Sequence, residues 1–349
     1  MAFDFDFELL RELTETSGAP GYEDRIRNVV RRELEEEVDE IRTDAMGNVV
    51  GTIEGESNYE VAVPAHMDEI GFMVTHVNED GFLSIDSLGG WDSRILRAQR
   101  VTVHAEDEDL TGVIGSTPPH LLDDDEDEQD VSDVYIDLGL SAEEAESRVS
   151  VGDIVTMEQT TTRVGDHVSG KALDDRVCLF AMLEAAKRIE NPSVTIHFCA
   201  TVQEEIGLRG AEALGVDVDP DLAVALDVTV ANDIPKVKYE KDYVTRLGEG
   251  TAIKLKDGSV VTSPKVHRRM RELAAERDIE HQLEVLPSGG TDTAGFQNTH
   301  GAKPVGAISI PTRYLHTVTE SAHGDDISAT IDLLTAFLET ETGEHDYRL

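Results

Sequence analysis

Residues 193–227, SVTIHFCATVQEEIGLRGAEALGVDVDPDLAVALD, carry the pattern from which the fold of this chain can be predicted. The pattern predicts a strand over residues 193–200, a helix over 207–214 and a second strand over 221–226. Strands that alternate with helices are typical of a layered α/β domain, which is the fold class we expect. The same alternation continues on both sides, with helices predicted at 174–190, 263–277 and 326–341 and strands at 251–255, 281–286 and 304–310.

The N-terminal part adds further elements to this predicted α/β domain. Apolar residues recur at helical spacing over residues 7–16 and 23–38, and two short β-branched runs follow at 47–53 and 59–64. The second of these runs leads directly to His66. Ligands at the carboxyl ends of strands are the usual arrangement in open α/β sheets, so His66 is a candidate site residue.

Residues 71–162 differ from the rest, because they show strand signals and turns without strong helical periodicity. We predict an inserted small β-rich domain of barrel or PDZ-like type there. The predicted limits are residues 1–70 and 163–349 for the two parts of the α/β domain and 71–162 for the insert. Within the insert, residues 123–130 are too charged to pack and are predicted to form a mobile loop. This loop either serves salt tolerance or lies near an active-site entrance and disfavours acidic peptides.

The composition is strongly acidic. The 349 residues include 72 acidic and 30 basic ones, which gives a formal net charge of −42. This charge would repel phosphate, and it argues against nucleic acid or an anionic membrane as a partner. Such an excess suits a protein dissolved in concentrated salt, where the Debye length is about 3 Å at 1 M. We therefore expect a halophilic source.

The cysteines and the N-terminus indicate the compartment. Cys178 and Cys199 lie in apolar stretches and are predicted to be core residues rather than a disulfide or a zinc site. A reducing cytoplasm is the natural location for such a chain. The N-terminus has no basic region followed by an apolar stretch, and no run of about 18 apolar residues occurs. We expect a soluble protein without an obvious export signal.

Two adjacent acids, Glu204 and Glu205, stand between a predicted strand and a predicted helix. One carboxylate of such a pair can hold a cation while its neighbour takes a proton from water, as hydrolytic metal chemistry requires. His66 and Asp68 are two positions apart, so on an extended chain Asp68 could accept the second ring N–H of His66. The alternative for that pair is a buried histidine satisfied by hydrogen bonds.

Asp174 begins the helix predicted at 174–190, and two functions are open to it on local grounds. Its carboxylate could cap the helix, or it could bridge two cations if both oxygens are free. Asp175 and Arg176 follow at once and would fix the local geometry. Position in the sequence alone leaves both functions possible.

Asp227 and His316 complete the set of candidate ligands. Asp227 follows the strand at 221–226, and His316 lies in a polar loop after the strand at 304–310, with His323 as a less favoured competitor. Together with the residues above they supply two imidazoles and three carboxylates, a donor set that suits Zn²⁺, Co²⁺ or Mn²⁺. Glu204 is then left over as the acid/base group.

The chain resembles the M42 family of metallo-aminopeptidases, the group whose archaeal members form tetrahedral assemblies of TET type. The resemblance spans essentially the whole chain and rests on six ordered motifs. They are Ser17-Gly18-Ala19-Pro20-Gly21-Tyr22-Glu23, Asp44-Ala45-Met46-Gly47-Asn48, His66-Met67-Asp68-Glu69-Ile70-Gly71-Phe72, Gly170-Lys171-Ala172-Leu173-Asp174-Asp175-Arg176, Val202-Gln203-Glu204-Glu205-Ile206-Gly207-Leu208-Arg209-Gly210-Ala211, and Gly289-Gly290-Thr291-Asp292 with His316.

The resemblance implies which residues hold which metal. His66, Asp174 and Asp227 would hold one divalent ion. Asp174, Glu205 and His316 would hold the other, so Asp174 would be shared between the two. The ions would be Zn²⁺ or Co²⁺.

The resemblance also implies the remaining roles. Glu204 would be the general base, Asp68 would orient His66, and residues 289–292 would line the cleft in a role that the sequence does not assign. The insert at 71–162 would be a dimerisation domain, and dimers would build a hollow dodecamer.

The predicted function is that of an aminopeptidase that removes N-terminal residues from peptides, with broad specificity and a preference for neutral or apolar residues. A free α-amine that coordinates the second metal beside acidic side chains would restrict cleavage to the chain end. Three alternatives remain: a zinc carboxypeptidase or deacylase, a polysaccharide hydrolase, and a noncatalytic scaffold. Glycosidases need no metal of this kind, and a scaffold would be expected to have lost ligands.

Overall fold

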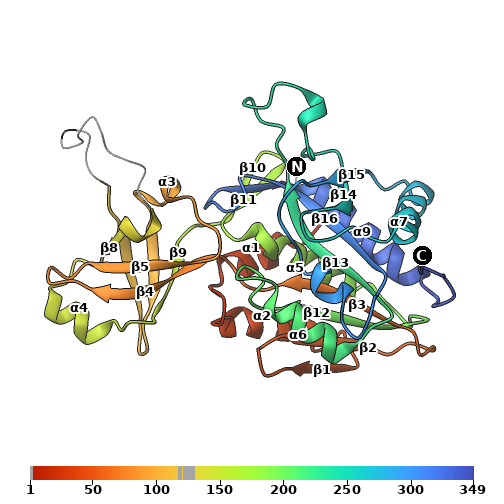
Figure 1. Ribbon diagram of the computed structural model, residues 1–349, viewed down its shortest axis with the longest axis horizontal. Coiled ribbons are helices and arrows are strands. Elements are labelled where there is room, and N and C mark those ends of the chain that lie inside the picture. Colours follow the sequence, from red (N-terminus) through yellow and green to blue (C-terminus); the bar gives the residue numbers. More distant parts are fainter. Residues whose placement is uncertain (1–2, 117–119, 121–129) are drawn as a thin grey trace.

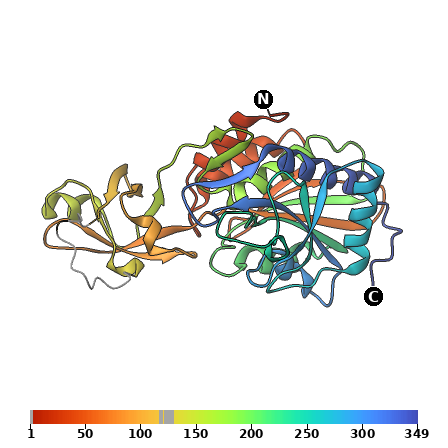
Figure 2. The same ribbon diagram turned by 90° about the horizontal axis from the view of Figure 1, so that it is seen from above.

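The structure is a computed structural model that describes residues 3–116, 120 and 130–349. It has two parts that lie side by side, a large mixed α/β part and a small β-barrel (Figures 1 and 2). The fold class expected from the sequence is thereby confirmed. Of the predicted acidic loop at 123–130, all but Asp130 lies outside the described residues, so its conformation stays a prediction.

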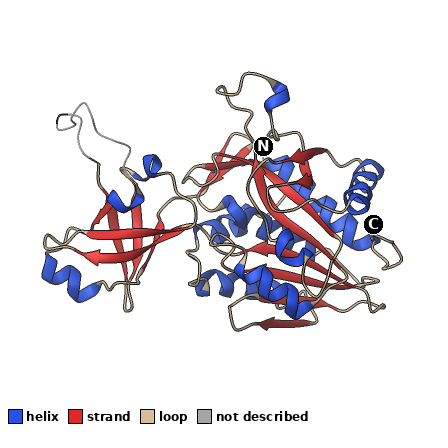
Figure 3. Cartoon of the chain, in the orientation of Figure 1, coloured by secondary structure: helices blue, strands red, loops and turns tan. Residues whose placement is uncertain are grey.

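The large part is built on an 11-stranded sheet, counted over the described residues. Its central strands β12, β3, β13 and β16 are parallel, the other strands on the path pair antiparallel, and β15 pairs parallel with β14 (Figure 3). The path of the sheet is β1 (Glu40–Thr43), β2 (Val49–Ile53), β12 (Thr195–Thr201), β3 (Glu60–His66), β13 (Leu222–Val230), β16 (Val305–Arg313), β17 (Glu320–His323), β11 (His167–Gly170) and β10 (Thr162–Val164), with β14 (Thr251–Lys256) beside β16 and β15 (His281–Val285) beside β14.

The central strands are buried because helices cover both faces of the sheet. β13, with the sequence LAVALDVTV, is buried at every position except its last, as a parallel strand between two helical layers should be. One face packs in a large apolar cluster and the other in a smaller one around Phe296. The large cluster includes residues of α1 (Phe7–Glu15), α2 (Asp24–Leu34), α5 (Leu173–Ala186), α7 (Pro264–Glu276) and α9 (Gly324–Thr340), and the smaller one includes residues of α6 (Arg209–Val218) and α8 (Thr293–Gln297).

The small part is a closed barrel of strands in the order β4, β5, β8, β7, β6, β9. Its own apolar cluster fills the interior, and β7 alternates strictly between exposed and buried residues, as a barrel strand with one solvated face does. The elements are β4 (Gly71–Val77), β5 (Leu83–Leu88), α3 (Ser93–Leu96), β6 (Arg100–His104), β7 (Asp109–Ile114), η2 (Val131–Asp133), β8 (Tyr135–Asp137), α4 (Ala142–Arg148) and β9 (Ile154–Met157). The limits at residues 70 and 162 remain a proposal.

Several short elements were not expected from the sequence. β1, β10, β11 and β17 have three or four residues each, and these runs are too short for a reliable alternation of apolar and polar residues. α4 lies inside the β-rich insert, and its capping box between Ser141 and Glu144 was a local signal for it. A 3₁₀ turn, η3 (Glu240–Asp242), completes the large part.

The two cysteines are buried and free, as predicted. None of the helices within the described residues combines the length and the apolar character that a membrane crossing requires.

Candidate metal centre

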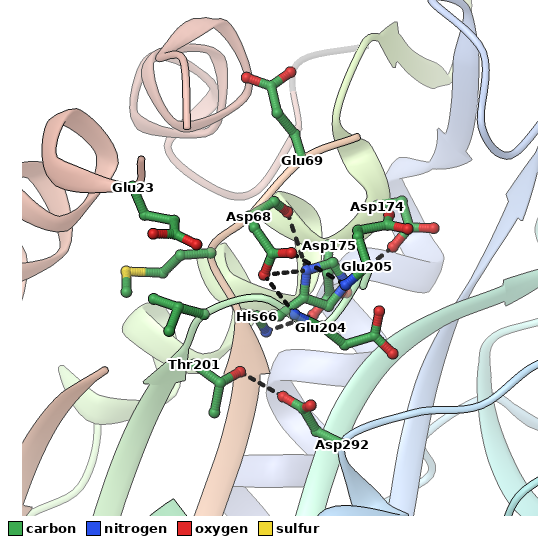
Figure 4. Close-up of polar contacts among 12 residues, drawn as sticks. Glu23, His66, Asp68, Glu69, Asp174, Asp175, Thr201, Glu204, Glu205 and Asp292 are labelled. Carbon is green, nitrogen blue, oxygen red and sulfur yellow. Dashed lines mark hydrogen bonds and ion pairs between the residues drawn. The ribbon is translucent and has the colours of Figure 1, made fainter. Parts of the chain in front are cut away.

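The predicted site residues meet at the carboxyl ends of the central parallel strands (Figure 4). β3 ends at His66, β12 ends at Thr201 just before Glu204 and Glu205, and Asp227 lies in β13. β3 pairs parallel with both β12 and β13, so these strand ends lie at the same edge of the sheet. The local sequence therefore explains the assembly of the site, because each motif follows a buried strand.

Asp174 lies between the two histidines. Its Oδ1 is 3.2 Å from Nε2 of His66, and its Oδ2 is 3.4 Å from Nε2 of His316. The first turn of α5 has Ala172 as its N-cap residue, and no side chain caps it. The structure excludes one of the two functions left open above: the Asp174 carboxylate faces the imidazoles and does not cap the helix. The bridging function stays a prediction.

Two groups of side chains have ligand atoms that all lie within 4.8 Å of one another, which is close enough to share a cation. One group is His66, Asp175 and Asp227, and the other is His66, Asp174 and Glu205. Nε2 of His316 lies 3.9 Å from Oε1 of Glu205. All five predicted ligands are therefore brought together, and the first group contains Asp175 where Asp174 was expected.

The hydrogen bonds of Asp175 distinguish it from Asp174. Asp175 is fully buried, and its Oδ2 accepts the main-chain N–H of His66 at 3.3 Å. Asp174 keeps 12% of its side chain exposed and contacts both histidines. Asp175 thus holds the end of β3, and Asp174 has the position predicted for the shared ligand.

The site holds more buried negative charge than the histidines can balance. Burial, reinforced by Asp174, raises the pKa of Glu205 to about 8, and burial raises the pKa of Asp227 and Glu204 well above the usual range of carboxyl groups. The Asp174 hydrogen bond raises the pKa of His316 to about 10. Buried carboxylates that repel one another in this way are the environment that divalent cations compensate.

Asp68 supports the site in a different way from the one expected. Nδ1 of His66 lies 3.0 Å from the main-chain oxygen of Asp68 and 3.5 Å from its carboxylate. The Asp68 carboxylate instead accepts the main-chain N–H groups of Glu204 at 3.0 Å and Glu205 at 3.1 Å. β3 ends at His66, so Asp68 is no longer on the extended strand that the prediction assumed.

Glu320 is a site residue that the sequence reasoning missed. It is buried, and its Oε2 accepts the main-chain N–H of Asp174 at 3.0 Å while its Oε1 accepts that of His316 at 2.8 Å. One carboxylate thus fixes two ligand residues that are far apart in the chain. The only signal was an acid four positions after His316, which is weak on its own.

Arg176 stabilises the same region through hydrogen bonds to the main chain. It is fully buried and donates to the main-chain oxygens of Met67 at 2.6 Å and Thr16 at 2.8 Å, and also to that of Leu13. The sequence predicted that Arg176 fixes local geometry. The structure shows that it does so through carbonyl groups on both sides of the site.

Residues with positive φ stand at the turns that carry the ligands. Ala172, Gln203 and His316 have φ values of 53°, 57° and 57°. Such left-handed conformations cost a non-glycine residue about 1–3 kcal/mol and persist only where surrounding contacts enforce them. His316 itself is one of these residues, so its position depends on its neighbours.

Asp292 brings the segment 289–292 to the floor of the site, below Glu204 and Glu205 (Figure 4). The hydroxyl of Thr201 donates to its Oδ2, while its Oδ1 has no partner among the described residues. Burial raises the pKa of Asp292 to about 6. His323, the competitor of His316, caps α9 by accepting the N–H of Asp325 and belongs to neither ligand group.

Comparison with known proteins identifies the family. The family model of M42 glutamyl aminopeptidases matches residues 47–333, which include all five predicted ligands. The chain belongs to the M42 peptidase family. It is accordingly an aminopeptidase, a hydrolase of peptide bonds, and the family is dependent on divalent metal ions.

Relatives of this M42 aminopeptidase cover nearly its full length. It is 36% identical to a lysyl aminopeptidase of Pyrococcus furiosus over 345 residues, 96% of this chain and 97% of that protein. The structure of an aminopeptidase from the archaeon Desulfurococcus kamchatkensis superimposes with a TM-score of 0.93 at 36% identity, covering 97% and 95% of the two chains. The TET1 peptidase of Pyrococcus horikoshii, which can assemble into a tetrahedron or a large octahedral shell, gives 0.87 at 34% identity, covering 96% and 99%.

Proposed function

We propose that this M42 aminopeptidase removes N-terminal residues from peptides at a centre of two divalent metal ions, with Glu204 as the general base. The observation that carries the proposal is the position of Asp174, whose two carboxylate oxygens face two different imidazoles. A carboxylate in that position is suited to sharing two cations. His66 and Asp227 would complete one ion's ligands, and Glu205 and His316 the other's.

The donor set fits Zn²⁺ or Co²⁺. Imidazole nitrogens and carboxylate oxygens bind these borderline ions well. The thiol of Cys178 lies beside Asp175, but burial raises its pKa well above the usual range and it belongs to neither ligand group. The uncompensated carboxylates described above supply the electrostatic reason for cations to bind. When bound, two such ions lower the pKa of a water toward 7 and polarise the peptide carbonyl.

Residues of this chain would then carry out the proton transfers. Glu204 is half-buried in the site, and desolvation raises the pKa of its carboxyl well above the usual range, a perturbation common among groups that act as acid and base in catalysis. It would accept the proton of the attacking water and pass it to the leaving amine. The Asp68 carboxylate, bonded to the N–H of Glu204, would keep this side chain in place.

Restriction to the chain end would follow from the metal centre. A free α-amine could coordinate the ion held by Asp174, Glu205 and His316, beside the acidic side chain of Asp292, and the nitrogen of an acylated N-terminus could not. The family description names glutamate and the Pyrococcus furiosus relative is named for lysine, so neither name assigns the side chain preferred here. We propose broad specificity with a preference for neutral or apolar residues.

An assay with matched substrates tests this function. We expect hydrolysis of leucine p-nitroanilide, at least about 100-fold slower hydrolysis of its N-acetyl derivative, and loss of activity on chelation that Zn²⁺ or Co²⁺ restores. Lysine and glutamate p-nitroanilides rank the preference. Release of C-terminal residues from a peptide would contradict the proposal and favour one of the alternative hydrolases. So would cleavage of a cellulose oligomer that continues in the presence of a chelator.

We also propose that the chain forms a homo-oligomer in which the barrel is the dimerisation domain and dimers build a dodecamer. The similarity to the TET1 peptidase over nearly the whole chain supports this. Light scattering coupled to size exclusion should give the mass of a dodecamer. A monomeric mass at micromolar concentration would contradict it.

Finally, we propose adaptation to concentrated salt and location in the cytoplasm. At a net charge of −42, self-repulsion destabilises the folded chain unless ions screen it. The midpoint of thermal unfolding should rise by more than about 10 °C between about 0.1 and 3 M KCl, because the Debye length falls well below the spacing of surface charges. Differential scanning calorimetry measures this, and a midpoint independent of salt would count against the halophilic origin.

A further inference from the structure

A loop of the inserted barrel reaches the metal centre. This loop, residues 89–92, connects β5 to α3, and the main-chain oxygen of Gly90 lies 2.8 Å from Nδ1 of His316. The bond fixes Nδ1 as the donor, so Nε2 is free to face Asp174 and Glu205. The barrel thus supplies the hydrogen-bond partner of a predicted metal ligand in the other part of the molecule.

Only glycine fits without displacing a neighbour at the two positions where this loop approaches the predicted ligands. A Cβ on Gly89 would lie 3.2 Å from Oε2 of Glu205 and 2.5 Å from a methyl group of Ile70. A Cβ on Gly90 would lie 3.1 Å from Nδ1 of His316. The loop therefore sits directly against two ligands, and its own position is fixed by the indole N–H of Trp91, which donates to the main-chain oxygen of Gly71 at 3.0 Å.

The loop that carries His316 in turn packs against the barrel. Val318, two residues after His316, is 6% exposed and belongs to the apolar cluster that fills the barrel. The loop that carries His316 is thus tied to the barrel by packing as well as by the Gly90 hydrogen bond. His316 has a positive φ, which requires such external support.

We propose that the inserted barrel is a positioning element of the metal centre, which holds the His316 imidazole toward Asp174 and Glu205 through the Gly90 carbonyl and the packing of Val318. The inference rests on the proposed metal centre. It adds a second role for the barrel, beside assembly. The ion held by Asp174, Glu205 and His316 then depends on the barrel, whereas the ion held by His66 and Asp227 does not.

Titration of the metal-free full-length chain with Co²⁺, followed by visible absorption, tests the inference. Gly90→Ala should move the imidazole by a few tenths of an ångström, and Val318→Ala should loosen its loop. In both variants we expect one of the two bound ions to lose about 10- to 100-fold in affinity with an altered spectrum, while the affinity for the other stays within about twofold.

Two substitutions on the barrel away from the site are matched controls. Gly115→Ala places a Cβ at 3.2 Å from the half-exposed ring of Tyr135, and Val113→Ala truncates an exposed valine. Both should bind Co²⁺ as the unaltered chain does. Circular dichroism of the metal-free variants checks folding, and if Gly90→Ala fails to fold, Val318→Ala decides.

The outcomes separate this inference from the proposed function. If the unaltered chain binds two ions and both Gly90→Ala and Val318→Ala bind them with unchanged affinity and spectra, the barrel does not position His316 and the inference is wrong. If the unaltered chain binds no Co²⁺ at all, the proposed metal centre itself fails.

Discussion

Replacing Glu204 by Gln should lower kcat for leucine p-nitroanilide by about 10³- to 10⁴-fold while two metal ions stay bound per chain. The amide keeps the shape of the side chain but cannot take a proton from water, and general-base catalysis contributes about 10²- to 10⁴-fold in enzymes. KM should change little, because the metal ligands and the cleft are unaltered. Steady-state kinetics and elemental analysis of the same preparation measure both quantities.

Glu212→Gln is the matched control for this variant, since Glu212 is an exposed glutamate in the first turn of α6 and belongs to neither ligand group. It should retain the activity of the unaltered enzyme. Loss of a metal ion in Glu204→Gln would show that Glu204 is a ligand and not the base. Retention of activity would exclude it from both roles.

Replacing Asp174 by Asn should have a larger effect, because it removes the carboxylate that faces both imidazoles. An amide offers one oxygen where the shared position needs two, and its NH₂ group cannot bind a cation. We expect at most one tightly bound ion per chain and a fall in kcat/KM of at least about 10³-fold, since the polarised water and carbonyl both depend on the paired ions. The Glu320 contact is to the main chain and would remain.

Asp107→Asn, an exposed aspartate on the barrel, controls for the loss of one negative charge. Its metal content and activity should match those of the unaltered chain. If Asp174→Asn binds two ions as tightly as before and Asp175→Asn does not, the shared ligand is Asp175, which also lies near His66 and Asp227.

The sequence predicted the parts of the site that follow from strand ends. His66 is the last residue of β3, and Glu204 and Glu205 follow β12, so parallel neighbours carry them to one edge of the sheet. Asp227 was expected just after a strand at 221–226, but β13 continues to Val230 and Asp227 lies within it. The α/β alternation was also predictable, because long segments with regularly spaced apolar residues identify the central strands and the helices that cover them.

The residues that hold the predicted ligands in place could not be predicted from the sequence, because they act through contacts between distant segments. The Gly90 carbonyl meets His316 across the interface of two parts of the fold, and the Glu320 carboxylate joins two main-chain N–H groups whose orientation is set by packing. The Asp68 carboxylate lies 3.5 Å from Nδ1 of His66 and also supports the turn at Glu204. The second contact could not be predicted from an extended chain, because Asp68 lies two residues beyond the end of β3.

An anomalous-scattering map of a crystal grown with Zn²⁺ or Co²⁺ tests the paired metal centre most directly. It should show two peaks per chain about 3.5–4 Å apart on either side of the Asp174 carboxylate, one beside His66 and Asp227 and one beside Glu205 and His316. A single peak, or peaks that leave Asp174 without contact to either ion, would contradict this account.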